Sequence, residues 1–237
     1  MRRDDEESGF GRRELLFGAS ALGLGGLLPA SANAQAGANP LVPNALTPEI
    51  EALVGSGCTV TGSDVQGPFW LNLNLVRQDI TEGSPGVPVQ LFLRIQDAAT
   101  CSPIEGAVVD VWQTDAAGDY SGFQSRGTQG LTFLRGIQLT PPSGLVSFQT
   151  IYPGWYSGRT MHLHVKVTPQ VGTELTTQLY FPQSVNDRVA TLPPYDLQGP
   201  PPVTNGTDGF FDAARLLKLR RDGAGNGIVA GKTIVVA

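Results

Sequence analysis

The chain contains two histidines, His162 and His164, with a single leucine between them. In a β-strand, side chains alternate between the two faces, so both imidazoles would lie on one face and Leu163, Val165 and Val167 on the other. Their Cβ atoms would then be roughly 6.5 to 7 Å apart, a separation that two ring nitrogens, each about 2.1 Å from a shared ion, can span. The pair could therefore bind a metal ion.

Two histidines do not complete a metal site, and no nearby acidic residue supplies a His-Glu-x-x-His pattern or an obvious facial triad. The remaining nearby donors are the phenols of Tyr120, in a turn-forming sequence, and Tyr156, in Pro153-Gly-Trp-Tyr156. The Pro-Gly-x-Tyr placement favours Tyr156 over Tyr152. A phenolate is a hard, anionic oxygen donor, and with two imidazoles it suits a ferric ion. The residue types predict one non-haem Fe(III) ion.

The composition favours an all-β fold. Thirty glycines and eighteen prolines stand between short apolar runs, which indicates many turns, and a chain of 237 residues can bury a sizeable core. We predict a β-sandwich of two mainly antiparallel sheets with long loops and little helix. The expected strands are Val87–Ile95, Ala107–Gln113, Val146–Tyr152, His162–Thr168, Leu175–Phe181, Leu216–Arg220 and Ile228–Val236.

Two other segments carry structural signals. The glycine-rich stretch 222–227 lies between the last two expected strands and predicts a terminal hairpin. The stretch Asn186–Phe210 contains two proline clusters and is expected to be a long irregular loop, which could form the wall of a pocket.

The N-terminal 34 residues are typical of an export signal. Arg12-Arg13 precede an apolar run rich in Leu, Ala and Gly, and Ala32-Asn-Ala34 provides a cleavage site. The twin arginines favour the twin-arginine pathway, which implies a periplasmic or extracellular protein without stable membrane insertion after the signal is removed. An ordinary secretory signal and a retained anchor are the alternatives. Residues 35–57 are expected to be an extended N-terminal segment, followed by one domain over residues 58–237.

Cys58 and Cys101 both lie in the exported part, where an oxidising compartment favours a disulfide between them over free thiols or metal binding. The formal net charge is −5, and Lys/Arg clusters occur only in the N-terminal arginines and at Arg220-Arg221. These features exclude an electrostatic nucleic-acid surface, so nucleic acid is not expected as a partner.

Short motifs follow one another in order between Cys58 and Phe181. They are Gly67-Pro-Phe69, Pro103-Ile-Glu-Gly-Ala107, Asp110-Val-Trp112, Asp115-Ala-Ala-Gly-Asp-Tyr120, Phe148-Gln-Thr-Ile-Tyr-Pro-Gly-Trp-Tyr156, Gly158-Arg159, His162-Leu-His164 and Thr177-Gln-Leu-Tyr-Phe181. This ordered set resembles the intradiol ring-cleavage dioxygenases, which include catechol and protocatechuate 3,4-dioxygenases. The resemblance implies that Tyr120, Tyr156, His162 and His164 bind iron, and that Arg159 and Gln178 line the substrate pocket.

The resemblance also implies a reaction. The substrates would be a small aromatic ortho-diol and O2, and the ring would be cleaved between its two hydroxylated carbons to give a cis,cis-muconate-type product. Tyr156 would leave the iron and accept a proton from the diol, while Arg159 would stabilise developing negative charge and Gln178 would orient intermediates. The choice of ring substrate stays open. So does a homodimer, because residues 35–57 cannot supply the helical dimerisation segment of cytoplasmic relatives.

Two alternatives remain at this stage. Gly106-Ala-Val-Val109 followed by Thr114–Tyr120 also resembles a carboxypeptidase regulatory-like strand and turn, which would make the chain a secreted, non-catalytic binding module. A zinc hydrolase that uses the two histidines is the other.

Overall fold

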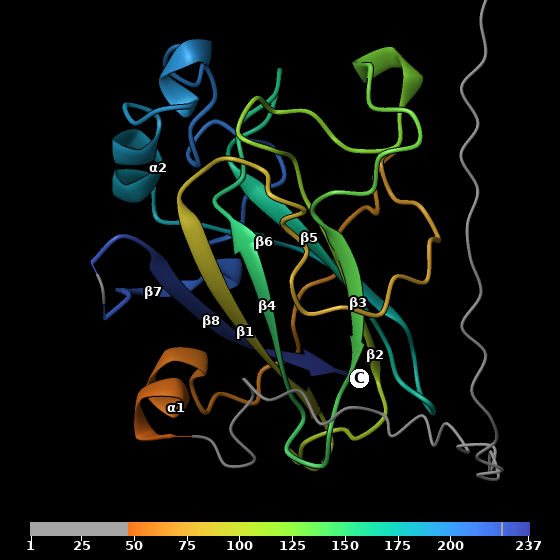
Figure 1. Cartoon of the computed structure of the whole chain (residues 1–237). Helices are drawn as coiled ribbons and strands as arrows, with labels where there is room; N and C mark the ends of the chain where they lie inside the picture. Colours follow the sequence, from red (N-terminus) through yellow and green to blue (C-terminus); the bar gives the residue numbers. More distant parts are fainter. Residues whose placement is uncertain (1–46, 224) are drawn as a thin grey trace, which may run out of the picture. The chain divides into compact units, whose positions relative to one another are not determined.

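The computed structural model describes residues 47–223 and 225–237, which form two four-stranded sheets (Figure 1). In the first sheet the strand order is β4 (Leu145–Ile151), β1 (Pro88–Asp97), β8 (Ile228–Val236) and β7 (Lys218–Arg221). In the second it is β3 (Arg135–Leu139), β2 (Val108–Trp112), β5 (His162–Thr168) and β6 (Leu175–Tyr180). The predicted all-β architecture with little helix is confirmed. The expected signal peptide, residues 1–34, lies outside the described residues.

Apolar side chains at alternating positions form the core between the sheets. Leu91 and Leu93 of β1 belong to the same buried cluster as Leu163, Val165 and Val167 of β5. Each fully buried aliphatic side chain of this kind contributes about 1.5–3 kcal/mol relative to an exposed one. Because the inward positions of β5 are apolar, the histidines between them must face away from this core.

Five of the six strand pairings are antiparallel, as predicted, and the exception is the parallel pair β1–β8. The predicted terminal hairpin is confirmed, since β7 and β8 pair antiparallel across the glycine-rich turn. The strand β7 begins at Lys218 rather than at Leu216, because a 3-10 helix, Ala213–Arg215, comes immediately before it.

The sequence did not predict β3, which pairs with β2 at the edge of its sheet and also forms an isolated parallel bridge between Ile137 and Val76. Its sequence, Arg-Gly-Ile-Gln-Leu, lacks the apolar alternation of the other strands. The first residue, Arg135, is charged although it is buried, and Gly136 has no side chain. A Cβ at Gly136 would lie 2.6 Å from Cγ2 of Ile80, so close packing of the preceding segment requires a glycine here.

The prediction that residues 35–57 are extended is wrong for the helix α1, Pro48–Val54. The Thr47 side chain caps its first turn by accepting a hydrogen bond from the Ile50 amide, and Pro48 stands at the first helical position, where its missing N–H costs nothing. With seven residues the helix is too short to be stable alone. Tertiary packing therefore decides its conformation.

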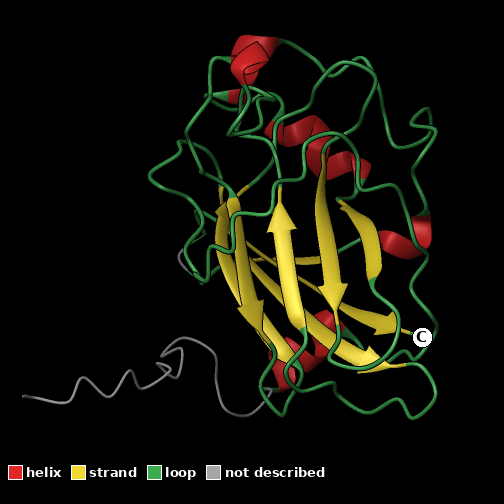
Figure 2. Cartoon of the chain, turned by 90° about the vertical axis from the view of Figure 1, so that its right-hand side faces the viewer, coloured by secondary structure: helices red, strands yellow, loops and turns green. Residues whose placement is uncertain are grey.

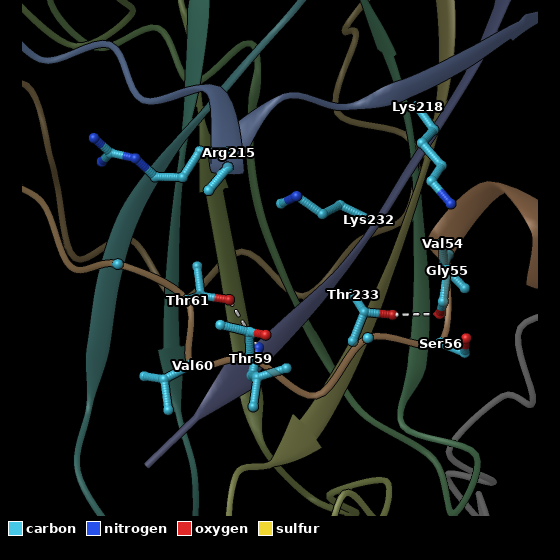
Figure 3. Close-up of a pocket in the computed structure, with 14 residues that line it drawn as sticks. Val54, Gly55, Ser56, Thr59, Val60, Thr61, Arg215, Lys218, Lys232 and Thr233 are labelled. Carbon is cyan, nitrogen blue, oxygen red and sulfur yellow. Dashed lines mark hydrogen bonds between the residues drawn. The ribbon is translucent and has the colours of Figure 1, made fainter.

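That packing occurs on the outer face of the first sheet. The apolar side of α1, with Ile50, Leu53 and Val54, forms a second buried cluster with Phe92, Leu145 and Val229. Figure 3 shows the end of this helix, where the Thr233 hydroxyl donates a 3.0 Å hydrogen bond to the Gly55 carbonyl. The Lys218 ammonium donates to the Ala52 carbonyl at 3.2 Å and so interacts favourably with the C-terminal end of the helix.

The stretch expected to be an irregular loop, Asn186–Phe210, is partly helical. The helix α2 spans Gln183–Val189, and a 3-10 helix spans Tyr195–Gln198. These two helical segments form because buried Val189 and Tyr195 pack against the main core. The proline-rich sequence does not reveal this packing. Figure 2 shows helices and loops gathered beyond one end of the strands. Within the described part of the chain, no helix has the length and apolar character needed to cross a membrane.

The predicted disulfide between Cys58 and Cys101 is present, with 43 residues of sequence separation. It joins the segment that follows α1 to the turn after β1. By loop-closure entropy, such a cross-link stabilises the folded state by about 4 kcal/mol.

We expect the double variant Cys58→Ser/Cys101→Ser to unfold at a markedly lower temperature than the wild type, because its unfolded chain is less constrained. Differential scanning calorimetry with and without a reducing agent measures this effect. The reducing agent should lower the Tm of the wild type and leave that of the double variant unchanged. Equal Tm values for the two proteins would contradict a stabilising role for the bond.

Candidate metal centre

His162 and His164 lie on the outer face of the second sheet, opposite the core side of β5. Strand register places His164 between Trp112 of β2 and Gln178 of β6, and it places His162 beside Tyr180. The His164 ring stacks on Trp112 with 4.8 Å between centroids and 8° between planes. Both histidines are 2% exposed. The predicted orientation of the pair is confirmed.

A tight turn places Tyr156 and Arg159 beside the histidines. The Arg159 amide donates a 3.1 Å hydrogen bond to the Tyr156 carbonyl, and Gly158 between them has a φ of 85°. Residues with a Cβ rarely adopt this left-handed conformation, so the glycine permits the turn. Strand β5 begins three residues after Arg159, which holds the turn at the end of the sheet.

Tyr120 comes from another turn, which is joined directly to the loop that precedes Tyr156. The Asp115 carbonyl accepts a 2.8 Å hydrogen bond from the Gly154 amide, and the Thr114 hydroxyl donates a 2.8 Å bond to the Gly154 carbonyl. A Cβ at Gly154 would lie 2.5 Å from the Asp115 carbonyl oxygen. The two tyrosine-bearing loops are thus in backbone contact, and this contact sets the separation of the phenols.

The four predicted ligands form a closed ring of neighbours. The centroid distances are 5.8 Å for Tyr120–Tyr156, 5.6 Å for Tyr156–His162, 5.0 Å for His162–His164 and 6.3 Å for Tyr120–His164. Tyr152, the alternative to Tyr156, instead donates a hydrogen bond to Asn186 inside the protein. The structure therefore brings together the residues that the sequence singled out.

Three polar atoms of the four candidate ligands are buried without hydrogen-bond partners. Eleven buried side-chain atoms among the described residues have none, and these include Tyr120 Oη, His162 Nε2 and His164 Nδ1. The Nδ1 atom of His162 lies 2.7 Å from the Thr160 carbonyl oxygen. Because a carbonyl only accepts, Nδ1 must carry the proton, which leaves the lone pair on Nε2. That unpartnered lone pair is the donor that a metal ion requires.

Burial keeps the imidazoles neutral. Desolvation, reinforced by the charge of Arg159, lowers the pKa of His162 to about 3, and desolvation together with His162 lowers the pKa of His164 well below its usual value. Neutral imidazoles are the form that ligates metals. The two histidines are therefore available as ligands at any pH near neutrality.

The pKa values of the two phenols are raised, whereas those of the imidazoles are lowered. Burial, with a smaller contribution from the nearby Tyr156, raises the pKa of Tyr120 well above that of a free phenol. Burial also raises the pKa of Tyr156, against the lowering effect of Arg159. A cation among the four side chains would favour ionisation of both phenols, so the donor set fits a highly charged, oxygen-seeking ion such as Fe(III). No group of three or more His, Cys, Asp or Glu side chains able to hold a metal occurs in the described part of the chain.

A cavity of about 290 Å³ opens beside these ligands. Its wall contains Tyr156, Arg159, His164 and Gln178, together with Val65, Gly67, Pro68, Phe69, Ser157 and Phe210. The predicted pocket residues Arg159 and Gln178 are therefore at the cavity. Phe210 is the last residue of the stretch that was expected to form a pocket wall. Phe69 also stacks on Tyr120 with a centroid distance of 4.5 Å.

One acidic residue at this site, Asp208, was not predicted from the sequence. Its carboxylate accepts hydrogen bonds from Arg159 Nε at 2.9 Å and from the Thr160 amide at 2.8 Å. No recognisable motif surrounds Asp208, and 49 residues separate it from Arg159. Only its position next to the guanidinium reveals it.

A second, larger cavity of about 380 Å³ lies beside α1 (Figure 3). Arg215, Lys218 and Lys232 contribute to its wall, but none of the predicted site residues does. Lys218 already contacts the end of α1, and Arg215 pairs with Asp64. The smaller cavity is the better candidate because the chemically distinctive side chains meet there.

A family described as "Dioxygenase" (Dioxygenase_C) matches residues 66–191, which is 126 of the 237 residues. The chain belongs to the intradiol ring-cleavage dioxygenase family. The match contains all four candidate ligands, Arg159 and Gln178, whereas Asp208 and Phe210 follow it.

The relatives of this dioxygenase-family chain act on several ring substrates. It is 29% identical over 155 residues to a chlorocatechol 1,2-dioxygenase from Rhodococcus opacus, covering 51% of this chain and 56% of that protein. It is 30% identical over 149 residues to a protocatechuate 3,4-dioxygenase beta chain from Burkholderia cepacia, covering 58% of this chain and 62% of that protein. The chain thus spans little more than half the length of these relatives.

Solved structures share its architecture over a larger fraction. An intradiol ring-cleavage dioxygenase from Tetranychus urticae superposes with a TM-score of 0.70 at 26% identity, covering 76% of this chain and 95% of that one. The dioxygenase domain of a carbohydrate-binding fusion protein from Streptomyces sp. SirexAA-E gives a TM-score of 0.59 at 32% identity, covering 75% of this chain and 98% of that one. The fold is the one found in these dioxygenases.

We expect Gly154→Ala to destabilise the protein by about 1–3 kcal/mol and to reduce metal binding, since the new methyl group would overlap the Asp115 and Ala116 backbone and push the tyrosine loops apart. Thermal unfolding and the stoichiometry of bound iron measure the two effects. Gly57→Ala is the matched control, because a Cβ there meets nothing within 4 Å. Equal stability and iron content in the two variants would disprove the role of this contact.

Proposed function

We propose that this family member is an Fe(III)-dependent dioxygenase that cleaves a catechol-type ring between its two hydroxylated carbons with O2, giving a cis,cis-muconate-type product. The observation that carries the proposal is the convergence of two phenols and two neutral imidazoles, three of them with buried unpartnered polar atoms, beside a cavity of about 290 Å³. A cavity of this size is at the lower end of small-molecule sites and suits a single aromatic ring.

Tyr120, Tyr156, His162 and His164 would hold the ion. When bound, ferric iron would activate the ortho-diol for reaction with O2. The rest of the chemistry depends on how the surrounding side chains hold protons and charge.

The two tyrosines differ in a way that suggests separate roles. Tyr120 is 1% exposed and does not contribute to the cavity wall, with Phe69 stacked on its ring and the Arg135 guanidinium 5.9 Å from its centroid. Tyr156 does line the cavity, and a hydrogen bond from Arg159 favours its anionic form. Tyr156 is therefore suited to accept a proton from an incoming diol, while Tyr120 stays in place.

Arg159 and Gln178 act as one hydrogen-bonded unit at the cavity. Arg159 Nη2 donates to Gln178 Oε1 and, at 3.3 Å, to the Tyr180 hydroxyl. A fixed guanidinium beside the reacting ring would stabilise negative charge that develops during oxidation. One amide N–H of Gln178 donates to the Val65 carbonyl at 3.4 Å. The other N–H is available for orienting the ring or its product.

The two alternative functions that the sequence leaves open differ from the proposed one in metal content. A non-catalytic binding module requires no ferric ligands, and a zinc hydrolase would contain zinc. Elemental analysis and a visible tyrosinate-to-iron charge-transfer band distinguish all three. A colourless, iron-free protein after iron loading would refute the proposed dioxygenase.

We further propose that the protein is exported through the twin-arginine signal of residues 1–34 to the periplasm or the extracellular space. The disulfide between Cys58 and Cys101 supports this proposal, because such bonds persist in oxidising compartments.

We expect Tyr120→Phe and His164→Ala each to abolish oxygen uptake with catechol through loss of bound iron. Each variant removes one of the four candidate donor side chains. Iron stoichiometry, the charge-transfer band and oxygen uptake are the measurements. Tyr152→Phe is the matched control: it removes a buried phenol oxygen outside the site, costs about 1 kcal/mol of stability and should retain iron. Full iron occupancy in Tyr120→Phe would remove Tyr120 from the ligand set.

We expect the double variant Arg12→Lys/Arg13→Lys to accumulate unprocessed inside a bacterial host that has the twin-arginine pathway, because that pathway requires the arginine pair. Cell fractionation followed by immunoblotting measures the location and length of the chain. Arg2→Lys/Arg3→Lys changes charge-matched arginines outside the pair and should be exported normally. Normal export of the first variant would show that another route is used.

A further inference from the structure

Arg159 is the one charged side chain among the described residues that line the cavity. The lining histidine is neutral, and Val65, Pro68, Phe69 and Phe210 make most of the remaining wall apolar. Within this wall, Arg159 is therefore the group that could pair with a negative charge on a ring substituent.

Asp208 already pairs with that charge. Its two carboxylate oxygens lie 2.9 and 3.2 Å from Arg159 Nε, and the side chains of Arg159 and Asp208 are 10% and 0% exposed. The Phe210 ring covers the guanidinium with 4.5 Å between Arg159 Cζ and the ring centroid. Asp208 thus balances the formal charge of Arg159, and Phe210 covers one face of the guanidinium.

The carboxylate of Asp208 is itself firmly held. It accepts 2.8 Å hydrogen bonds from the Thr160 amide at one oxygen and from the Phe210 amide at the other. Burial alone would raise its pKa, but these amides and Arg159 outweigh burial and lower it. Asp208 therefore stays ionised at neutral pH, and its backbone bonds fix it beside Arg159.

We propose that Asp208 determines the charge of the substrate: by pairing with Arg159, it makes the cavity select ortho-diols with uncharged ring substituents over those with a ring carboxylate. This inference rests on the proposed function and concerns the same cavity. Asp208 acts through Arg159 and is a positioning and specificity residue rather than a catalytic one.

The physical reason is desolvation. A ring carboxylate that entered the cavity would lose its water and find no free cation, and it would also be repelled by Asp208. A hydrogen, methyl or chlorine substituent would meet apolar wall residues instead. Removing the charge of Asp208 would release Arg159 to pair with a substrate carboxylate, and the geometry of such a pair suits a guanidinium.

The experiment compares catechol, 4-methylcatechol and protocatechuate on the iron-loaded wild type, Asp208→Asn and Asp208→Glu. Oxygen uptake gives kcat/KM, and anaerobic titration calorimetry gives Kd independently of turnover. We expect the wild type to favour catechol over protocatechuate by at least about 100-fold, a difference within reach of one unpaired buried charge. Asp208→Asn should reduce that ratio at least tenfold, mainly through a lower Kd for protocatechuate. Asp208→Glu keeps the charge and should keep the preference.

Glu82→Gln is the remote control, because it removes a carboxylate from another arginine pair, that with Arg77, away from the cavity. The ratio of its kcat/KM for catechol to its kcat/KM for protocatechuate should equal that of the wild type. A wild type that uses protocatechuate as well as catechol would overturn the inference even if Asp208→Asn does not fold, and so would an unchanged ratio in a folded Asp208→Asn. Either result leaves the proposed ring cleavage standing. If no diol is cleaved by the iron-loaded wild type, the proposed function itself fails.

Discussion

The candidate site depends on one unfavourable feature, the burial of polar atoms that have no hydrogen-bond partner. His162 Nε2 and His164 Nδ1 are buried without a hydrogen-bond partner, and Tyr120 Oη is buried beside the Tyr156 phenol. Such burial costs free energy, and most buried polar groups in folded proteins avoid it. A metal ion held by these side chains would offset part of that cost. The same burial keeps the imidazoles neutral and therefore ready to ligate.

The sandwich holds these atoms together by two kinds of contact. Antiparallel pairing of β5 with β2 and β6 fixes the histidines, because each is locked in register between neighbouring strands. The tyrosines come from turns, and these are held by the hydrogen bond from Gly154 to the Asp115 carbonyl. The core side of β5 is wholly apolar, so the strand cannot shift by one residue without burying the histidines in the core. The scaffold, rather than attraction between the four side chains, therefore holds the candidate ligands close together.

The charge pairing at the cavity separates two functions that would otherwise conflict. A guanidinium near the reacting ring stabilises negative charge, but a free guanidinium would also attract any anionic ring. Pairing Arg159 with Asp208 keeps the side chain in place and reduces its net charge. The relatives act on chlorocatechol as well as on protocatechuate, so substrate charge is a property that varies within the family. The residue that we propose sets it here lies beyond the matched family segment.

The sequence by itself determined much of this protein, because the decisive patterns are local. Period-two alternation placed His162 and His164 on one face of a strand, turn residues predicted the final hairpin, and donor types indicated a ferric site. The pairing of Cys58 with Cys101 followed from their being the two cysteines available. Only the tertiary structure decided the closeness of Tyr120 to Tyr156, the helical state of α1, the edge strand β3 and the role of Asp208. Each of these depends on contacts between residues far apart in the chain, and such contacts are set by packing and desolvation rather than by neighbouring residues.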